Sequence, residues 1–126
     1  MPLRDDEIRS LAETWIEHQL HNRGLGSEAT FWAWERLWEL TDSEPEEAWR
    51  VIEAIRHANG TDLMLGNLGA GPLEDLLSQH GDQFIDRVET LARRDAQFRK
   101  LLGAVWQNTM SEEVWSRVRA AAGASF

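Results

Sequence analysis

The sequence predicts an all-α protein, and three observations support this. Apolar residues recur at the spacing of one helix face along the chain, whereas the alternation typical of strands is missing. Residues that are typical of helix starts and helix ends recur at short intervals along the chain. With 42% hydrophobic residues and no cysteine, the 126 residues can fill a core without disulfides. We therefore expect a single helical domain over residues 1–126, with about seven to eight short helices in antiparallel hairpins.

The breaks between apolar faces define the expected helices. They span about 5–22, 28–41, 44–59, 62–68, 72–80, 82–92, 98–106 and 112–122. The run Arg23-Gly24-Leu25-Gly26 ends the first helix, Gly69-Ala70-Gly71 separates the fourth from the fifth, and Gly81 ends the fifth in a left-handed conformation. Ser43 and Ser111 are the expected caps of the third and the last helix. Short connections favour antiparallel neighbours, in either a HEAT-like right-handed stack or a compact orthogonal bundle.

The charge of the chain is strongly acidic. Asp and Glu outnumber Lys and Arg by 22 to 13, a net charge of −9. Such a charge argues against nonspecific binding to nucleic acid or to anionic membranes, and it suits a basic protein partner. Neither a secretion signal nor an apolar run of about 20 residues is present, so we expect a cytoplasmic protein.

One segment is distinctive. The run Leu68–Leu77, Leu-Gly-Ala-Gly-Pro-Leu-Glu-Asp-Leu-Leu, with His80-Gly81 after it, resembles the core of a family of small bacterial proteins of unknown function. The likeness extends through Trp34, Trp49, Phe84–Arg87 and Leu102–Trp106. Members of that family often carry Pro where this chain has Ala96, a departure that bears only on where a helix begins. The resemblance implies a bacterial source and a helical fold, and it transfers no mechanism.

Glu74, Asp75 and His80 lie in this segment and are the candidates for acid–base chemistry or ligand binding. The two carboxylates fall in the first turn of the expected helix, where free backbone N–H groups and the helix dipole stabilise negative charge. Asp75 and His80 have the spacing i, i+5, which is poor for direct contact on a helix. An ion pair from Glu74 or Asp75 to Arg93 or Arg94 of the next hairpin is favoured over a catalytic role. A small-ligand binder or enzyme centred on Glu74, Asp75 and His80 stays the alternative.

No metal or cofactor is expected. His18 and His21 with Glu17 form the one metal-like cluster, but no second element offers His or Cys ligands. Gly69-Ala70-Gly71 precedes a helix and could present N–H groups to an anion. Pro72 removes one of those donors, and acidic residues follow, so phosphate binding is disfavoured.

Seven tryptophans without a tyrosine are the unusual feature of the composition. Trp15, Trp38, Trp106 and Trp115 fall on or at the edge of apolar faces and are predicted to lie in the core. Trp32 instead points into the acidic, polar sector of its helix. Either that helix is buried on two sides, or Trp32 is an exposed aromatic residue in an acidic field.

The acidic charge gathers in the N-terminal half, with 13 acids and 6 bases in residues 1–60 against 9 and 7 in residues 61–126. An aromatic side chain among acids is typical of a hot spot for a basic partner. The sequence thus predicts a noncatalytic protein–protein interaction module, for example an immunity-type inhibitor of a basic toxin or nuclease. The predicted partner-binding residues are Trp32, Glu35, Glu39, Glu46 and Glu47. A solvated junction of two helices is the alternative explanation of these acids.

Overall fold

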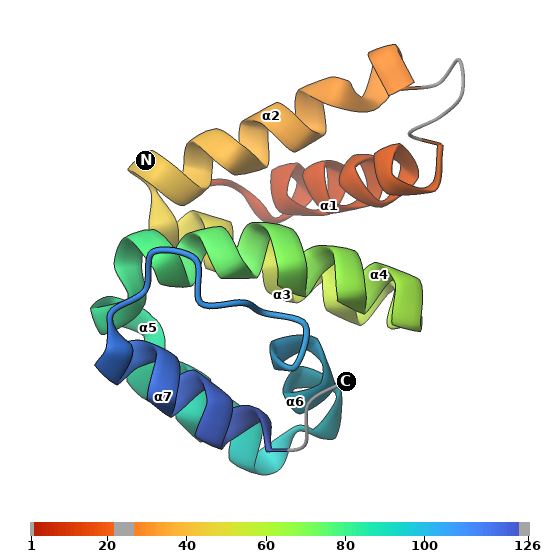
Figure 1. Ribbon diagram of the computed structural model, residues 1–126. Coiled ribbons are helices and arrows are strands. Elements are labelled where there is room, and N and C mark those ends of the chain that lie inside the picture. Colours follow the sequence, from red (N-terminus) through yellow and green to blue (C-terminus); the bar gives the residue numbers. More distant parts are fainter. Residues whose placement is uncertain (1, 22–26, 124–126) are drawn as a thin grey trace. The chain divides into compact units, whose positions relative to one another are not determined.

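Helices build two units in the computed structural model, which describes residues 2–21 and 27–123 (Figure 1). Contacts along the chain divide it into unit 1, Met1–Met64, and unit 2, Leu65–Phe126. All regular elements of the described residues are helical, which confirms the all-α prediction. The single domain, the HEAT-like stack and the orthogonal bundle stay predictions.

Three helices pack against one another in unit 1: α1 (Asp5–Leu20), α2 (Ser27–Ser43) and α3 (Pro45–Ala58). Their buried faces come from the apolar periodicity, and Trp15 is 1% exposed among them. The expected end of the first helix at residues 23–26 lies outside the described residues. The predicted cap at Ser43 is wrong, because Ser43 still belongs to α2 and its hydroxyl donates to the Glu39 carbonyl at 2.9 Å. Pro45 begins α3 directly after Glu44.

The stretch from residue 62 to residue 94 departs most from the prediction. The helix α4 (Asp62–Leu68), the π-helical turn η1 (Gly69–Leu73) and the helix α5 (Glu74–Arg94) follow one another without a break. Pro72 lacks an N–H group and would clash in a regular α-helix, and the wider π turn accommodates it. α5 kinks at His80, with φ −134° and ψ 30°, where an end was predicted. When α4, η1 and α5 are counted as one continuous helix, the described residues form six helices. The prediction of seven to eight helices is therefore not confirmed.

Gly81 follows the kink, and its predicted left-handed conformation is wrong. Among the described glycines, a positive φ occurs at Gly123, which ends the last helix as predicted. A Cβ atom at Gly81 would lie 2.9 Å from Cγ1 of Val114. The absence of a side chain at Gly81 therefore lets two helices approach closely, and no unusual backbone angle is needed.

Two short helices complete unit 2. Asp95 caps α6 (Ala96–Leu102) by accepting a hydrogen bond from the Phe98 N–H group at 3.1 Å. The predicted cap at Ser111 is confirmed, since its hydroxyl accepts from the Val114 N–H group at 3.1 Å and α7 (Glu112–Ala122) follows. α6 ends well before Trp106, so the predicted helix up to that residue is wrong.

A charged contact joins α5 to α7. Arg117 lies 2.6 Å from carboxylate oxygens of both Glu89 and Asp86. A second hydrogen bond, from Nε of Arg117 to Glu89 at 2.9 Å, makes the Glu89 pair bidentate. These hydrogen bonds lower the pKa of Glu89 below its ordinary value. The contact sets the register of the two helices, whereas the buried apolar faces supply most of the stability.

The tryptophans divide between core and surface. The core prediction is confirmed for Trp15, while Trp115 is half-buried with the Arg119 guanidinium 6.0 Å from its ring centre. The prediction is wrong for Trp38, which is 55% exposed, and for Trp106, which is 73% exposed. Trp38 stands next to the buried Leu37 on its helix and is turned about 100° away from it. Trp106 lies in the loop after α6, where no helix face holds it.

Candidate functional site

The solvent-facing side of α2 carries the largest group of exposed aromatic side chains among the described residues. The exposed fractions are 44% for Phe31, 47% for Trp32, 42% for Trp34 and 55% for Trp38. Phe31, Trp34 and Trp38 follow one another at the spacing i, i+3, i+7, which aligns them along one side of the helix, and we call them the aromatic row. The opposite side of α2 is buried through Thr30, Ala33, Leu37, Leu40 and Thr41.

Carboxylates stand beside the aromatic row. The helix spacing places Glu28, Glu35, Glu39 and Asp42 along the middle of the exposed face, with Trp32 on their far side. We call these four residues the acidic row. Glu39 lies 3.8 Å from Arg36, and the other three carboxylates make no ion pair or hydrogen bond with the described residues. Free negative charge is therefore flanked by aromatic rings on both sides.

Contacts within unit 1 hold part of the aromatic row in place. The rings of Phe31 and Trp34 are stacked, with centroids 5.4 Å apart and an angle of 23° between their planes. Phe31 also forms a T-shaped pair with His18 on α1, with ring centroids 5.9 Å apart. His18 in turn lies 2.9 Å from the Thr30 hydroxyl through its Nδ1 atom. These contacts restrict the rotamers of Phe31 and Trp34, so less side-chain entropy is lost when a partner binds them.

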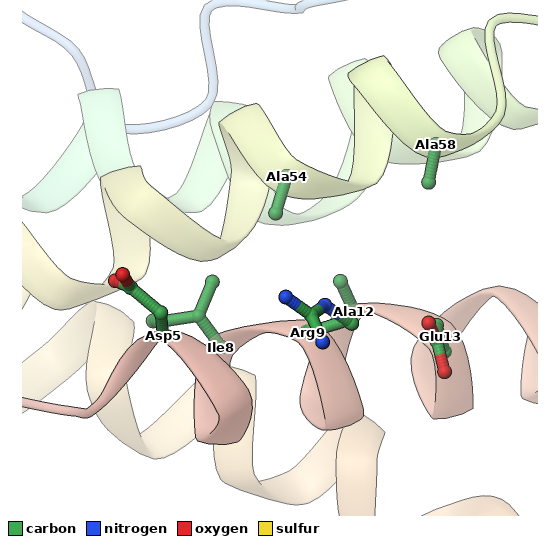
Figure 2. Close-up of a pocket in the computed structure, with 7 residues that line it drawn as sticks. All are labelled: Asp5, Ile8, Arg9, Ala12, Glu13, Ala54 and Ala58. Atoms are coloured by element: carbon green, nitrogen blue, oxygen red, sulfur yellow. The ribbon is translucent and has the colours of Figure 1, made fainter.

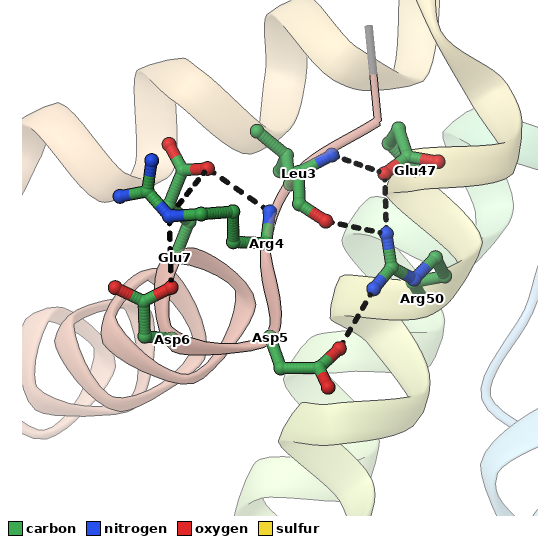
Figure 3. A network of polar contacts seen from close by, with 7 residues as sticks. All are labelled: Leu3, Arg4, Asp5, Asp6, Glu7, Glu47 and Arg50. Carbon is green, nitrogen blue, oxygen red and sulfur yellow. Dashed lines mark hydrogen bonds and ion pairs between the residues drawn. The ribbon is translucent and has the colours of Figure 1, made fainter.

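Glu46 and Glu47, also predicted to bind a partner, lie at the start of α3. The Glu47 side chain is only 12% exposed and belongs to the polar network of Figure 3. Its Oε1 atom accepts from the Leu3 N–H group at 2.8 Å and from Arg50 at 2.6 Å. Arg50 also donates to the Leu3 carbonyl at 2.9 Å and lies 3.1 Å from Asp5. Glu47 thus anchors the N-terminal segment to α3, whereas Glu46 is exposed.

Glu74 of the alternative site has a structural role in unit 2. Its two carboxylate oxygens accept from the Trp106 N–H group at 2.9 Å and from the Asn108 side chain at 3.1 Å. The predicted ion pair to Arg93 or Arg94 is wrong. Both arginines lie at the other end of the kinked helix α5, beyond His80, and no described ion pair joins them to Glu74 or Asp75. Glu74 instead fixes the loop between α6 and α7.

Asp75 lies beside Glu74, half-buried and without a hydrogen bond or ion pair to the described residues. Burial, and then the negative charge of Glu74, raise the pKa of Asp75 above its ordinary value. Because η1 runs into α5, the N–H group of Glu74 already bonds to carbonyls of η1. The predicted stabilisation by a free helix N-terminus is therefore wrong at this position. The structure does not bring Asp75 and His80 together in a described hydrogen bond.

Replacing Asp75 with asparagine is expected to stabilise the protein at neutral pH. The raised pKa means that the folded state binds the proton more tightly than the unfolded state, so the charged form costs stability at high pH. The gain should be below about 1 kcal/mol because the side chain is partly solvated. In urea unfolding it should grow as the pH rises from the ordinary pKa of aspartate, 3.8, and level off above the raised value. Glu113→Gln, at an exposed carboxylate, is the control, and an equal gain there would contradict the prediction.

A groove between α1 and α3 is a second surface feature of unit 1 (Figure 2). Its volume is about 290 Å³, and Ile8, Ala12, Ala54 and Ala58 form its apolar lining. The charged side chains of Asp5, Arg9 and Glu13 complete it from α1. The small alanines create the hollow. The groove could not be predicted from the sequence, because these alanines fit apolar helix faces equally well.

The described part of the chain contains neither a candidate metal-binding group nor a candidate membrane-spanning helix. No three His, Asp or Glu side chains of residues 2–21 and 27–123 are grouped so that they could hold a metal ion. None of the helices in those ranges combines the length and the apolar character that crossing a bilayer requires.

The sequence-based prediction names Trp32, Glu35 and Glu39 but does not include the aromatic row. Trp38 borders the apolar face, which predicts a core position, and Phe31 and Trp34 are not among the predicted site residues. The signal was present: α2 carries large aromatics at too many angles for a single buried stripe. A helix with that pattern either is covered on two sides or exposes aromatic rings.

Comparison with known proteins places the chain in a family. A model described as a family of unknown function (DUF6869) matches residues 20–125. No curated protein and no solved structure matches the chain. The match covers α2 with its exposed face as well as the segment Leu68–Leu77 that carries the resemblance. The chain therefore belongs to this family of unknown function.

Proposed function

We propose that this protein is a noncatalytic interaction module that binds a basic protein partner through the exposed face of α2. One observation carries the proposal. Four large aromatic side chains lie exposed on a single helix beside carboxylates that have, apart from Glu39, no partner among the described residues.

Energetics supports this use of the face. Aromatic residues, tryptophan above all, are enriched in the central hot spots of protein interfaces, where each can contribute about 2 kcal/mol or more. Exposed as they are here, the rings of α2 leave apolar area in water that a partner would cover. The acidic row would attract a basic partner over a distance of about 10 Å and repel acidic ones.

An immunity-type inhibitor of a basic toxin or nuclease is one concrete form of this proposal, with the bacterial cytoplasm as its setting. Small size, strong acidity and the resemblance to small bacterial proteins support it. An inhibitor of this kind needs a rigid, complementary surface and no catalytic group. The contacts that restrict Phe31 and Trp34 suit that requirement.

Affinity capture with matched variants tests the proposal. The face variant combines Trp32→Ala with Glu35→Lys and Glu39→Lys, all at exposed positions of α2. The control variant combines Trp106→Ala with Glu113→Lys, which are exposed in unit 2. We expect a basic protein that the wild type and the control capture and the face variant does not. With purified components, calorimetry should show at least a roughly 100-fold weaker affinity for the face variant, since it removes a hot spot and reverses two charges.

The outcome of this experiment depends on whether the face variant still binds the partner. A partner that binds the face variant as tightly as the wild type uses another surface, and the proposal for α2 is then wrong. Circular dichroism of both variants checks that the helices are intact, so that lost binding is not lost folding.

A further inference from the structure

The guanidinium group of arginine has two properties that match the side chains on the exposed face of α2. The guanidinium group is planar and weakly hydrated, so it can stack on an aromatic ring and bond to a carboxylate at the same time. The lysine ammonium is strongly hydrated and binds as a point charge. A face of carboxylates alone would attract both cations, whereas carboxylates between aromatic rings favour the guanidinium.

On α2, aromatic rings and carboxylates each recur at an interval of one helical turn. Trp34 and Trp38 are separated by one turn of the aromatic row, and Glu35 and Glu39 by one turn of the acidic row. Each turn rises about 5.4 Å. Arginines placed one turn apart on a partner helix would therefore meet a carboxylate and a ring at successive positions.

The chain already places guanidinium groups over aromatic rings elsewhere. The Arg87 guanidinium lies 4.8 Å from the ring centre of Phe84, and that of Arg119 lies 6.0 Å from the ring centre of Trp115. Each pair lies within a single helix, the first within α5 and the second within α7. On α2, no described arginine lies over the ring of Trp32, Trp34 or Trp38. These rings are left for a cation from outside.

The charge of α2 argues against a second copy of the chain as the partner that covers its exposed face. α2 carries the four carboxylates of the acidic row and a single basic residue, Arg36. Two such faces brought together would place like charges opposite each other without compensation. The same charge disfavours nucleic acid and anionic lipid.

We infer that the exposed face of α2 recognises a helix that presents arginines one turn apart, and that it discriminates against lysine. This inference rests on the proposed function and adds the chemistry of the partner. The aromatic row provides the discrimination, and the acidic row provides the attraction.

Three labelled peptides test the inference by fluorescence anisotropy with the full chain. The first is an alanine-based helical peptide with arginine at positions i, i+4 and i+7, the second has lysine there, and the third has the neutral analogue citrulline. We expect the arginine peptide to bind about fivefold more tightly than the lysine peptide, the factor that corresponds to roughly 1 kcal/mol of exposed cation–π stacking. The citrulline peptide should show no binding.

Two variants separate the contributions. Trp34→Ala with Trp38→Ala should bring arginine binding down to the lysine level, and Trp106→Ala should change nothing. Glu35→Gln with Glu39→Gln and Asp42→Asn should weaken both cationic peptides by about tenfold or more, since three charges are removed.

Each result that contradicts these expectations overturns a different part of the argument. Equal binding of the arginine and lysine peptides by the wild type overturns the inference and leaves the basic partner of the proposed function standing. An arginine preference that survives in the double tryptophan variant overturns the role of the aromatic row. Failure of both cationic peptides to bind more tightly than the citrulline peptide overturns the proposed function as well.

Discussion

Replacing Trp15 with alanine is expected to lower the free energy of unfolding by roughly 3–5 kcal/mol. Trp15 is 1% exposed and is the largest fully buried side chain described in unit 1, where α1 contacts both α2 and α3. Truncation removes its apolar contacts and leaves a cavity that three packed helices can fill only in part. Urea unfolding followed by circular dichroism measures the loss.

Two matched variants sharpen this prediction. The indole N–H group of Trp15 is buried without a hydrogen-bond partner among the described residues. Trp15→Phe keeps most of the ring and removes this unpaired donor, so it should cost much less than Trp15→Ala. Trp106→Ala removes the same side chain at a 73% exposed position and should change the stability little. A loss at Trp106 equal to that at Trp15 would contradict the assignment of core and surface.

Replacing Gly69 with alanine is expected to destabilise unit 2 by roughly 3 kcal/mol, at the upper end of the cost of overpacking. Gly69 is the first residue of η1, and it lies against α6. A Cβ atom there would collide with the carbonyl oxygen of Leu101 and would lie 2.9 Å from the Cβ atom of Ala104. Because one of these atoms belongs to the backbone, the clash can be relieved only by moving α6 away from η1. Thermal and urea unfolding should both register the loss.

Gly66 and Gly71 provide the matched controls for Gly69. A Cβ atom at either position would meet nothing within 4 Å, and neither glycine has a positive φ. Gly66→Ala in the interior of α4 should therefore raise the stability by about 0.5–1 kcal/mol, because alanine loses less conformational freedom in a helix. If Gly69→Ala were as stable as Gly66→Ala, the close contact of η1 with α6 would be wrong.

Local physics explains what could be predicted from the sequence. Helical periodicity, the cap at Ser111 and the end of the last helix at Gly123 depend on residues within one turn of each other. The concentration of acids in the first half and the polar setting of Trp32 are likewise set by the order of residues along the chain. For the same reason Trp32, Glu35 and Glu39 could be proposed as site residues from the sequence alone.

Tertiary packing decided the rest, because it depends on which neighbour covers which side of a helix. Trp38 and Leu37 both adjoin the apolar stripe of α2, and only the position of α1 and α3 buries Leu37 and leaves Trp38 exposed. The Gly-Pro segment looked like a break, but a π turn carries the helix through it. The helix also continues, with a kink, past His80, which places Arg93 at the other end of α5 and leaves the Glu74 carboxylate to the loop at Trp106. The sequence thus determined the acidic N-terminal half and the position of Trp32 in the polar sector of its helix. The row of exposed rings that makes α2 a candidate binding face follows from how the helices pack.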